Sequence, residues 1–276
     1  MARVLCSTGA LIGKPNGRDY RLLEPLSKQL ECDGYEFMMY PDWYGQMDDI
    51  VALIKRNGIS VPAFHAQKGI GEKITAGGQE DTDEALTTFK INVEMAAKLG
   101  AEKIVLHLWD GLSSDSCFQN NLNTYAELRG IADAAGIMLL VENVVCNVQD
   151  PWTHWQQLVK HYPDVRFVFD TKMAAFHGQT DELYKKENAF LMDEGHIRHF
   201  HVNDYAGGYM DWNNLKTLAI GNGHIDFETF FAFIREKGYN DTFTLESTAF
   251  DRMTGVVDTD LLNREIRYVR EQLARE

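Results

Sequence analysis

The chain contains no CxxC pair and no apolar run long enough to span a membrane, and we expect no secretion signal. Its four cysteines are scattered and form no CxxC pair, which is typical of reduced thiols in a cytoplasm-like compartment. No apolar stretch approaches the length of a membrane span, and the apolar run within residues 1–9 is too short for a signal peptide. We therefore expect a cytoplasmic protein without a membrane partner.

Basic charge is also scarce. Lys and Arg number 27 against 41 Asp and Glu, so the formal net charge is −14. An acidic chain without a long Lys/Arg run repels nucleic-acid phosphates, which disfavours nucleic acid as a partner. The sequence contains no interdomain linker and no low-complexity segment. Its 276 residues, of which 45% are hydrophobic, fit a single domain over residues 1–276.

Short apolar segments recur along the whole chain. They are rich in Val, Ile, Phe and Leu and do not alternate cleanly with polar residues, as expected for parallel strands that are covered on both faces. The eight predicted strands are Val4–Leu11, Gly34–Tyr40, Val61–Ala66, Lys103–Leu108, Met138–Val144, Val165–Asp170, Ile197–Val202 and Thr242–Ser247.

Amphipathic segments separate most of these strands. The clearest is Asp83–Leu99, where Leu86, Phe89 and Val93 share one helical face and Gly100 provides a C-terminal stop. The other predicted helices are Met47–Arg56, Leu122–Ala135, Pro151–His161, Phe227–Lys237 and Asp260–Arg275.

The alternation of strands and helices predicts an α/β fold with parallel pairing through right-handed crossovers. Eight such units in a chain of this length favour a (β/α)8 TIM barrel. A doubly wound open sheet is the alternative, but no GxGxxG motif follows the first predicted strand. Longer segments follow the third and seventh strands, at Gln67–Thr82 and Asp204–His224. Both would lie on the face where the C-terminal strand ends meet.

Four consecutive strands carry an acidic or imidazole side chain at or near their C-terminal end. Taken singly, an aspartate can cap a helix, a glutamate can pair with a lysine, and a histidine can be a core residue. In a barrel, however, the strand ends converge, and crowded carboxylates repel one another unless a cation neutralises them. Mixed carboxylate and imidazole donors suit Mn²⁺, Mg²⁺, Co²⁺ or Zn²⁺, and they do not choose among these metals. The candidate ligands are Glu142, Asp170, His201 and Glu246.

Several runs around these residues resemble the xylose isomerase-like TIM-barrel superfamily, and the resemblance covers nearly the whole chain. That superfamily includes sugar-phosphate isomerases, ketose 3-epimerases, inosose and 3-dehydroshikimate dehydratases, and endonuclease IV. The runs, in chain order, are Leu139–Asn143, Phe167–Thr171, His199–Asp204, Ala219–Phe227 and Thr244–Ser247.

The resemblance implies that Glu142, Asp170, His201 and Glu246 bind one divalent metal ion. Mn²⁺ is the first expectation, with Mg²⁺, Co²⁺ or Zn²⁺ as alternatives. It also implies that Glu142 and Glu246 are catalytic, one taking a proton from the carbon beside a carbonyl and the other returning it. A homo-oligomer is an expectation by analogy alone.

Other polar and aromatic residues near the strand ends are candidates for binding substrate. The histidines that end the third and fourth strands can hydrogen-bond substrate hydroxyls or instead support a ligand. A tryptophan can line a sugar site or simply pack, and Lys172 can instead pair with Asp181 or Glu182. The candidate substrate-binding residues are His65, His107, Trp109, Lys172, His177 and Asn203.

The chain also departs from its relatives. Met173 stands where the epimerases have a substrate-binding histidine, and Gly207 and Gly208 occupy the region of an arginine that many relatives carry. Endonuclease IV requires further metal ligands at Met173 and in the region 215–217, where this chain has none. This difference, together with the acidic charge, argues against three metals and against DNA repair.

We therefore expect a divalent-metal-dependent isomerase or epimerase that acts on a sugar or polyol ketone. No glycine-rich phosphate cradle is present, so the expected substrate is an unphosphorylated sugar or cyclitol. The first alternative is a metal-dependent dehydratase of a keto-cyclitol, of the inosose or 3-dehydroshikimate type. An AP-endonuclease-like hydrolase and a barrel that binds without catalysis are the remaining alternatives.

Overall fold

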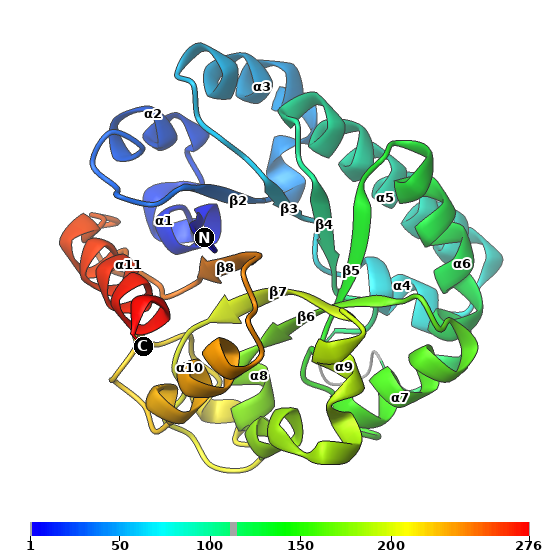
Figure 1. The fold of residues 1–276 in the computed structure, drawn as a ribbon. Helices are drawn as coiled ribbons and strands as arrows, with labels where there is room; N and C mark the ends of the chain where they lie inside the picture. Colours follow the sequence, from blue (N-terminus) through cyan, green and yellow to red (C-terminus); the bar gives the residue numbers. More distant parts are fainter. Residues whose placement is uncertain (1, 111–114, 276) are drawn as a thin grey trace.

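The structure is a computed structural model, and it describes residues 2–110 and 115–275. Eight parallel strands close into a barrel in the order β1 to β8, with β8 pairing back onto β1 (Figure 1). The predicted (β/α)8 TIM barrel is thereby confirmed. The strands are β1 Arg3–Ser7, β2 Gly34–Met38, β3 Ala63–His65, β4 Lys103–Leu106, β5 Met138–Glu142, β6 Arg166–Asp170, β7 Ile197–Val202 and β8 Thr242–Leu245.

Helices surround the barrel (Figure 1). The α-helices are α1 Thr8–Leu11, α2 Leu23–Leu26, α3 Met47–Arg56, α4 Ile70–Ala76, α5 Gln79–Leu99, α6 Phe118–Ala134, α7 Pro151–His161, α8 Thr171–Phe176, α9 Phe190–Asp193, α10 Phe227–Glu236 and α11 Thr259–Ala274. Short 3₁₀ segments lie at Lys14–Asn16, Tyr20–Leu22, Pro41–Gln46, Thr180–Tyr184, Lys186–Asn188 and Trp212–Asn214.

The first predicted strand is wrong beyond Ser7. The Ser7 hydroxyl accepts a hydrogen bond from the Gly9 backbone N–H at 3.1 Å and caps the short helix α1, so Thr8–Leu11 is helical. The Thr8 hydroxyl in turn accepts from the Met38 N–H on β2 at 2.9 Å. These side-chain bonds replace the strand ladder that the apolar run alone predicts.

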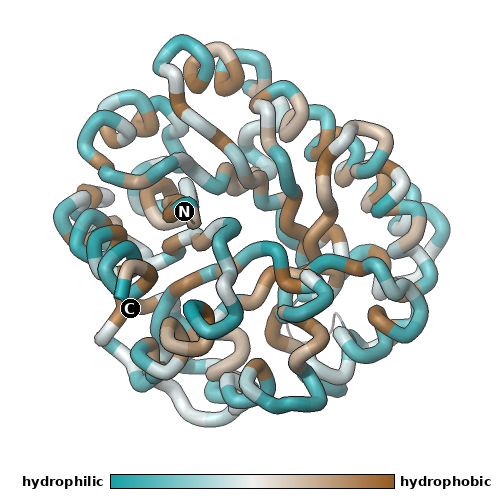
Figure 2. Tube along the Cα trace, in the orientation of Figure 1, coloured by the Kyte–Doolittle hydropathy of each residue, from teal (hydrophilic) through white to brown (hydrophobic). Residues whose placement is uncertain are grey.

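The hydrophobic core lies mainly between the sheet and the surrounding helices. Figure 2 shows apolar residues concentrated on the strands and polar residues on the outer turns of the helices. Inside the barrel, Val105, Leu140 and Val168 form a separate small cluster on β4, β5 and β6. The next strand in register places His199 beside Val168 and Thr242 beside His199. The barrel interior is therefore apolar on one side and polar on the other.

A lysine closes the N-terminal end of the barrel interior. The Lys103 ammonium donates to Asp241 Oδ1 at 2.6 Å, to the Arg198 carbonyl at 2.8 Å and to the Thr242 hydroxyl at 2.9 Å. Because a buried ammonium without partners is costly, these three acceptors allow Lys103 to remain in the interior.

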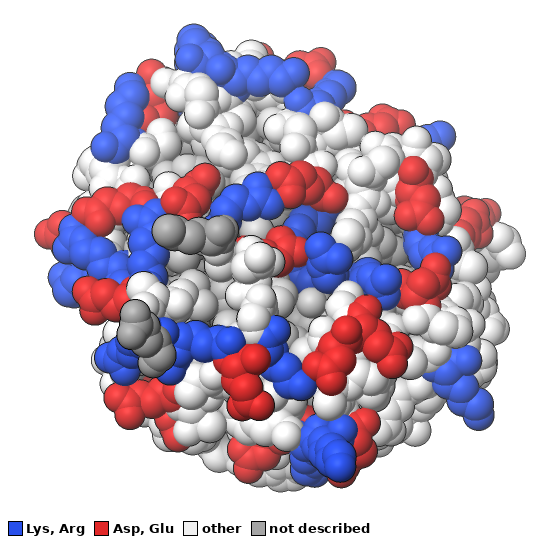
Figure 3. All heavy atoms as spheres, viewed as in Figure 1, with Lys and Arg blue, Asp and Glu red and all other residues white. Residues whose placement is uncertain are grey.

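The surface charge is interspersed on the face that carries both chain ends. Figure 3 shows acidic and basic side chains next to one another there, without a broad basic stripe. No helix in the described part of the chain combines the length and apolar character that a membrane crossing requires.

Candidate metal centre

The four predicted ligands meet at the C-terminal mouth of the barrel. Glu142 and Asp170 are the last residues of β5 and β6, His201 lies near the end of β7, and Glu246 follows β8 directly. Parallel register places Asp170 opposite His201 on the neighbouring strand. One ligand atom from each of the four side chains lies within 4.8 Å of every other.

The His201 ring directs one nitrogen at the three carboxylates. Nδ1 lies 3.0 Å from Glu142 Oε1, 3.6 Å from Glu246 Oε1 and 3.9 Å from Asp170 Oδ2. Glu142, Asp170 and His201 are almost completely buried, whereas 12% of the Glu246 side chain is exposed. Glu246 is therefore the member of the cluster that solvent reaches.

The cluster concentrates negative charge in a buried place. Burial raises the pKa of Asp170 to about 6, and the Glu246 and Glu142 carboxylates add to this against the opposing charge of Lys172. Burial opposes protonation of His201, but the same glutamates and Glu36 hold its pKa well above the ordinary value. Three carboxylates and one imidazole nitrogen within this space fit a divalent cation by donor type and by charge.

Two further histidines contact the second oxygen of Glu142. The Nε2 atoms of His107 and His65 lie 2.9 Å and 3.4 Å from Glu142 Oε2, and the two rings meet edge to face at 4.8 Å. Burial opposes charging His107, but Glu142 and Asp110 prevail and raise its pKa to about 8. The structure thus places both predicted histidines against a metal-ligand candidate.

Asn203 and Lys172 also lie beside the cluster. The Asn203 amide donates to Asp170 Oδ2 at 3.1 Å and to Glu246 Oε2 at 3.3 Å, and it therefore orients both carboxylates. Lys172 is buried on α8 and donates to the Thr217 hydroxyl at 3.1 Å.

Trp109 and His177 are placed away from the four ligands. The Trp109 indole N–H donates to the Val144 carbonyl at 2.7 Å, and its ring packs edge-on against Phe118. His177 Nε2 accepts from the Cys146 N–H at 3.1 Å. The structure does not bring these two side chains into the cluster, and their roles in binding substrate stay predictions.

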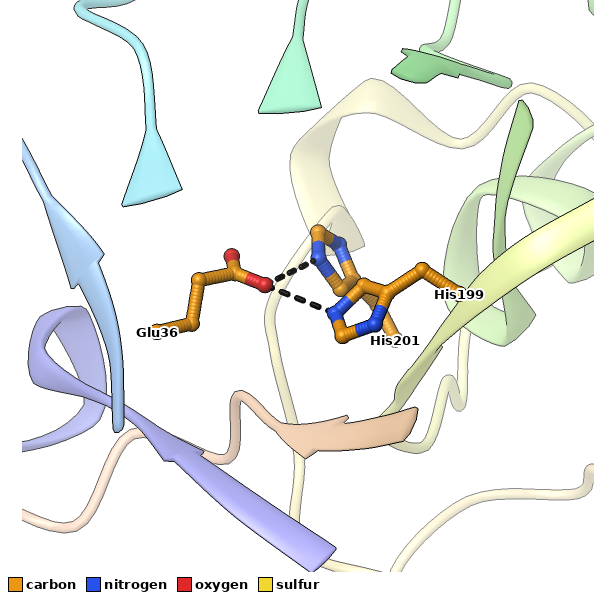
Figure 4. Close-up of side chains that lie close together, drawn as sticks. All are labelled: Glu36, His199 and His201. Carbon is orange, nitrogen blue, oxygen red and sulfur yellow. Dashed lines mark hydrogen bonds and ion pairs between the residues drawn. The ribbon is translucent and has the colours of Figure 1, made fainter. Parts of the chain in front are cut away.

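Sequence reasoning missed Glu36. This residue lies in the middle of β2 and is completely buried. Its Oε2 atom lies 3.0 Å from His201 Nε2 and 2.8 Å from His199 Nε2. Figure 4 marks both contacts with dashed lines. A carboxylate inside the otherwise apolar segment Gly34–Met38 was the available signal, because a buried charge requires partners.

Lys68 was also missed. It lies in the segment between β3 and α4, three residues after His65, and solvent reaches its side chain. Desolvation by the surrounding protein lowers the pKa of Lys68. The carboxylates of Glu246, Glu142 and Asp110 outweigh this effect and raise the pKa above its ordinary value. Lys68 therefore brings a positive charge to the mouth of the barrel.

The segment after β7 is held by an aspartate within a ring of backbone donors. Asp204 Oδ2 accepts from the N–H groups of Gly221 and Gly223 at 2.9 Å each, and Oδ1 accepts from those of Tyr205 and Ile225. A Cβ at Gly223 would lie 2.3 Å from Asp204 Oδ1. The Gly-Asn-Gly run therefore acts here as a carboxylate-binding turn that fixes the chain beside Asn203.

Comparison with known proteins agrees with this architecture. Residues 25–272 match the family model described as xylose isomerase-like TIM barrel. No curated protein sequence matches the chain.

Solved structures resemble the chain over almost its full length. A D-psicose 3-epimerase from Clostridium cellulolyticum H10 has a TM-score of 0.70 at 14% identity, covering 98% of both chains. A D-allulose 3-epimerase from Methylomonas sp. has a TM-score of 0.73 at 13% identity, covering 99% of this chain and 98% of the other. A 3-keto-D-glucoside 4-epimerase from E. coli has a TM-score of 0.68 at 16% identity, covering 98% and 100%. At such identities the likeness concerns the fold, and the family model over residues 25–272 carries the assignment: the chain belongs to the xylose isomerase-like TIM barrel family.

Proposed function

We propose that this protein is a divalent-metal-dependent isomerase or epimerase of a sugar or polyol ketone. The observation that carries the proposal is the meeting of Glu142, Asp170, His201 and Glu246 within 4.8 Å at the barrel mouth. The names of the similar structures, which are epimerases of D-psicose, D-allulose and a 3-keto-glucoside, support this substrate class. Mn²⁺ is the first metal to test, followed by Mg²⁺, Co²⁺ and Zn²⁺.

The four ligand candidates would hold the ion, and two of them would also move a proton. When bound, a divalent ion polarises a ketone carbonyl and acidifies the adjacent C–H bond. One of Glu142 and Glu246 takes that proton as a carboxylate, and the other, in its carboxylic acid form, returns a proton to the opposite face of the same carbon. The substrate gains and loses one proton, so only its configuration changes.

Neighbouring residues suit these roles. His107 Nε2 lies 2.9 Å from Glu142 Oε2, and its positive charge would stabilise that carboxylate. Asn203 donates to Glu246 Oε2 and keeps that carboxylate oriented. In this proposal, Lys68 and His65 would contact substrate hydroxyls. General acid–base action of this kind contributes about 10²- to 10⁴-fold in rate.

The second candidate function is dehydration of a keto-cyclitol by the same base. Met173, in the place of the epimerase histidine, is buried, and its backbone N–H donates to Asp170 Oδ1 at 2.8 Å. Gly207 offers no side chain, and a Cβ there would lie 2.3 Å from the Tyr205 hydroxyl. These two positions therefore lack the histidine and the arginine found in the epimerases. Because of this difference, elimination should be tested together with epimerisation.

The test begins with elemental analysis of the purified protein and a screen of unphosphorylated ketoses and cyclitols with each metal. Chromatography detects epimers, ultraviolet absorbance detects the enone of a dehydration, and NMR in D₂O detects deuterium at the epimerised carbon. We expect epimers carrying solvent deuterium.

Variants connect the activity with the carboxylates. Glu142→Gln and Glu246→Gln should each lower turnover by about 10²-fold or more, whereas Glu271→Gln, at an exposed position on α11, should leave it unchanged. Unchanged turnover of an identified substrate by a folded Glu142→Gln variant would exclude this role, and enone formation would favour the dehydratase.

Location and assembly complete the proposal. All four cysteines are free in the structure, which supports a cytoplasmic location. A homo-oligomer stays a prediction that sedimentation of the purified protein can test.

A further inference from the structure

Glu36 is a buried acid that the proposed proton transfer does not use. Its side chain is completely buried. Strand β2, which pairs with β1 and β3, lies on the polar side of the barrel interior. The Oε2 atom of Glu36 meets His199 Nε2 at 2.8 Å, His201 Nε2 at 3.0 Å and the Thr244 hydroxyl at 3.1 Å. In Figure 4 both imidazole rings on β7 point toward this single oxygen from the side opposite β2.

The two nitrogens of His201 face different acidic groups. Nδ1 faces the ligand carboxylates, the nearest being Glu142 Oε1 at 3.0 Å, and Nε2 faces Glu36. A neutral imidazole carries one N–H and one lone pair, so a proton held on Nε2 leaves the lone pair of Nδ1 for a metal. The reverse arrangement would aim an N–H at the metal position.

The direction of the surrounding hydrogen bonds favours the first arrangement. Lys103 can only donate, and it donates to the Thr242 hydroxyl at 2.9 Å. That hydroxyl can then donate its own proton to His199 Nδ1, which lies within hydrogen-bond distance. His199 consequently carries its proton on Nε2 and donates it to Glu36 Oε2.

An ionised carboxylate only accepts hydrogen bonds, so the chain of donors ends at Glu36. His201 Nε2, the remaining imidazole neighbour of Oε2, must donate as well. The chain Lys103, Thr242, His199 and Glu36 therefore runs through the barrel interior and meets the metal centre at His201 Nε2.

We propose that Glu36 is a positioning residue of the metal centre, which holds the His201 ring with its Nδ1 lone pair directed at the ion. This inference rests on the proposed metal-dependent function. Carboxylate partners of this kind orient metal-binding histidines in other proteins, and their loss typically weakens metal binding by about 10- to 100-fold.

A second ion held by Glu36, His199 and His201 is the competing interpretation, because their ligand atoms also cluster. It would require His201 to bind a metal through each nitrogen and to lose its N–H altogether. Three side chains, those of His199, His201 and Thr244, already converge on Glu36 Oε2 at hydrogen-bond distances of 2.8–3.1 Å. We therefore assign this group to hydrogen bonding.

The test compares metal binding by the full-length wild type and Glu36→Gln. An amide at this position is uncharged and can present its own N–H groups, so it no longer fixes the His201 proton on Nε2. We expect calorimetric titration with Mn²⁺ to show affinity lowered by about 10- to 100-fold, and Co²⁺ loading to give an altered visible spectrum. Circular dichroism and thermal unfolding confirm that the variant is folded.

Two further variants separate positioning from general damage. Asp150→Asn also replaces a hydrogen-bonded carboxylate by an amide, but at the N-cap of α7, and it should leave Mn²⁺ affinity and the Co²⁺ spectrum unchanged. His201→Asn removes the ring that Glu36 contacts. If Glu36 acts through His201, adding Glu36→Gln to His201→Asn should weaken binding no further.

The outcomes distinguish this inference from the proposed function. Wild type that binds no divalent ion would overturn both. Tight binding by wild type with equal affinity and an equal spectrum in Glu36→Gln would overturn only the positioning role. Two bound ions per chain, or full additivity of Glu36→Gln and His201→Asn, would overturn it in favour of direct ligation by Glu36.

Discussion

The two oxygens of Asp170 have separate partners. Oδ1 accepts from the Met173 N–H at 2.8 Å and caps α8, whereas Oδ2 faces Asn203 and the His201 ring. A helix cap and a metal ligand are thus compatible explanations of one aspartate. Substitutions at this residue can separate them.

We expect Asp170→Asn to keep the helix cap and to weaken metal binding. Asparagine caps helices about as well as aspartate, but it removes one of three carboxylates from the cluster. Mn²⁺ titration should show affinity reduced by about 10-fold or more, with little change in the urea midpoint without metal. Asp170→Ala should lower both, and a metal affinity of Asp170→Asn equal to that of wild type would contradict the ligand assignment.

Gly223 is a second residue at which a single atom matters. An added Cβ would lie 2.3 Å from both Asp204 Oδ1 and the Tyr205 carbonyl oxygen, so Gly223→Ala must disturb the Asp204 turn. We expect a loss of about 1–3 kcal/mol in the free energy of unfolding, measured by urea denaturation.

Gly130→Ala is the matched control for Gly223→Ala. A Cβ at Gly130 on α6 would meet no atom within 4 Å. Alanine there should stabilise the helix by about 0.5–1 kcal/mol. Equal midpoints for the two variants would show that the Asp204 turn relaxes without cost.

At the scale of elements, caps and apolar runs made much of the fold predictable. The helices Met47–Arg56 and Pro151–His161 have the predicted bounds, because Gly58 and the pair Asp150-Pro151 mark their ends locally. Among the strands, β6 and β7 end at Asp170 and Val202 as predicted, whereas β2, β3, β4, β5 and β8 end one or two residues before the predicted positions. Convergence of these ends then follows from barrel closure alone.

Features that depend on distant partners were not predictable. The apolar sequence of Thr8–Leu11 predicts a strand. The segment is helical because of the Ser7 cap and the hydrogen bond between Thr8 and β2. Glu36 has apolar neighbours in β2, and its partners on β7 and β8 are more than 160 residues away in sequence. Residues 204–225 carry no periodic pattern, and their path is fixed by the Asp204 turn.

Helix α11 joins the barrel through a buried acid whose ionisation should make stability depend on pH. Burial raises the pKa of Glu265 to about 7 from its ordinary value of 4.5. Between these values the folded protein keeps a proton that the unfolded chain has released. The bound proton contributes its full stabilisation at pH values below the lower pKa. This contribution, on the order of 3 kcal/mol, is lost as pH rises through the upper pKa.

Glu265→Gln should remove this dependence. Glutamine can still accept from the Ser247 hydroxyl and the Ile220 N–H, which contact Oε1 at 2.8 Å and 2.7 Å. Denaturation at about pH 5 and about pH 8 should show a smaller decline for this variant than for wild type. The exposed Glu271→Gln on the same helix should behave as wild type; an unaltered decline in Glu265→Gln would refute the assignment.

At the scale of the whole molecule, the metal centre connects strands that are far apart in the chain. Glu142 is the last residue of β5, and Glu246 directly follows β8. Only the closed barrel therefore brings the ligands together. An ion that binds the native state alone should raise the unfolding temperature, by the equivalent of about 2.7 kcal/mol at 100 times its Kd.

We therefore expect Mn²⁺ to increase the thermal unfolding midpoint and EDTA to reverse the increase. The midpoint should keep rising with Mn²⁺ concentration, as mass action requires. Ca²⁺ at equal concentration serves as a control for ionic strength. A midpoint that is insensitive to Mn²⁺, Mg²⁺, Co²⁺ and Zn²⁺ alike would rule out a native metal site.

The pairing of β1 with β8 has a consequence for synthesis in the cell. Arg3 in β1 has Thr242 as its register partner, so the sheet cannot close until nearly the entire barrel has left the ribosome. At about 5–20 residues per second, β1 waits roughly 12–50 s for β8. Until β8 emerges, β1 and the latest strand to form each have one unpaired edge. Each such edge offers free backbone hydrogen-bonding groups to other nascent chains. Chaperone protection during this interval should therefore matter more for this protein than its closed, edge-free final sheet would indicate.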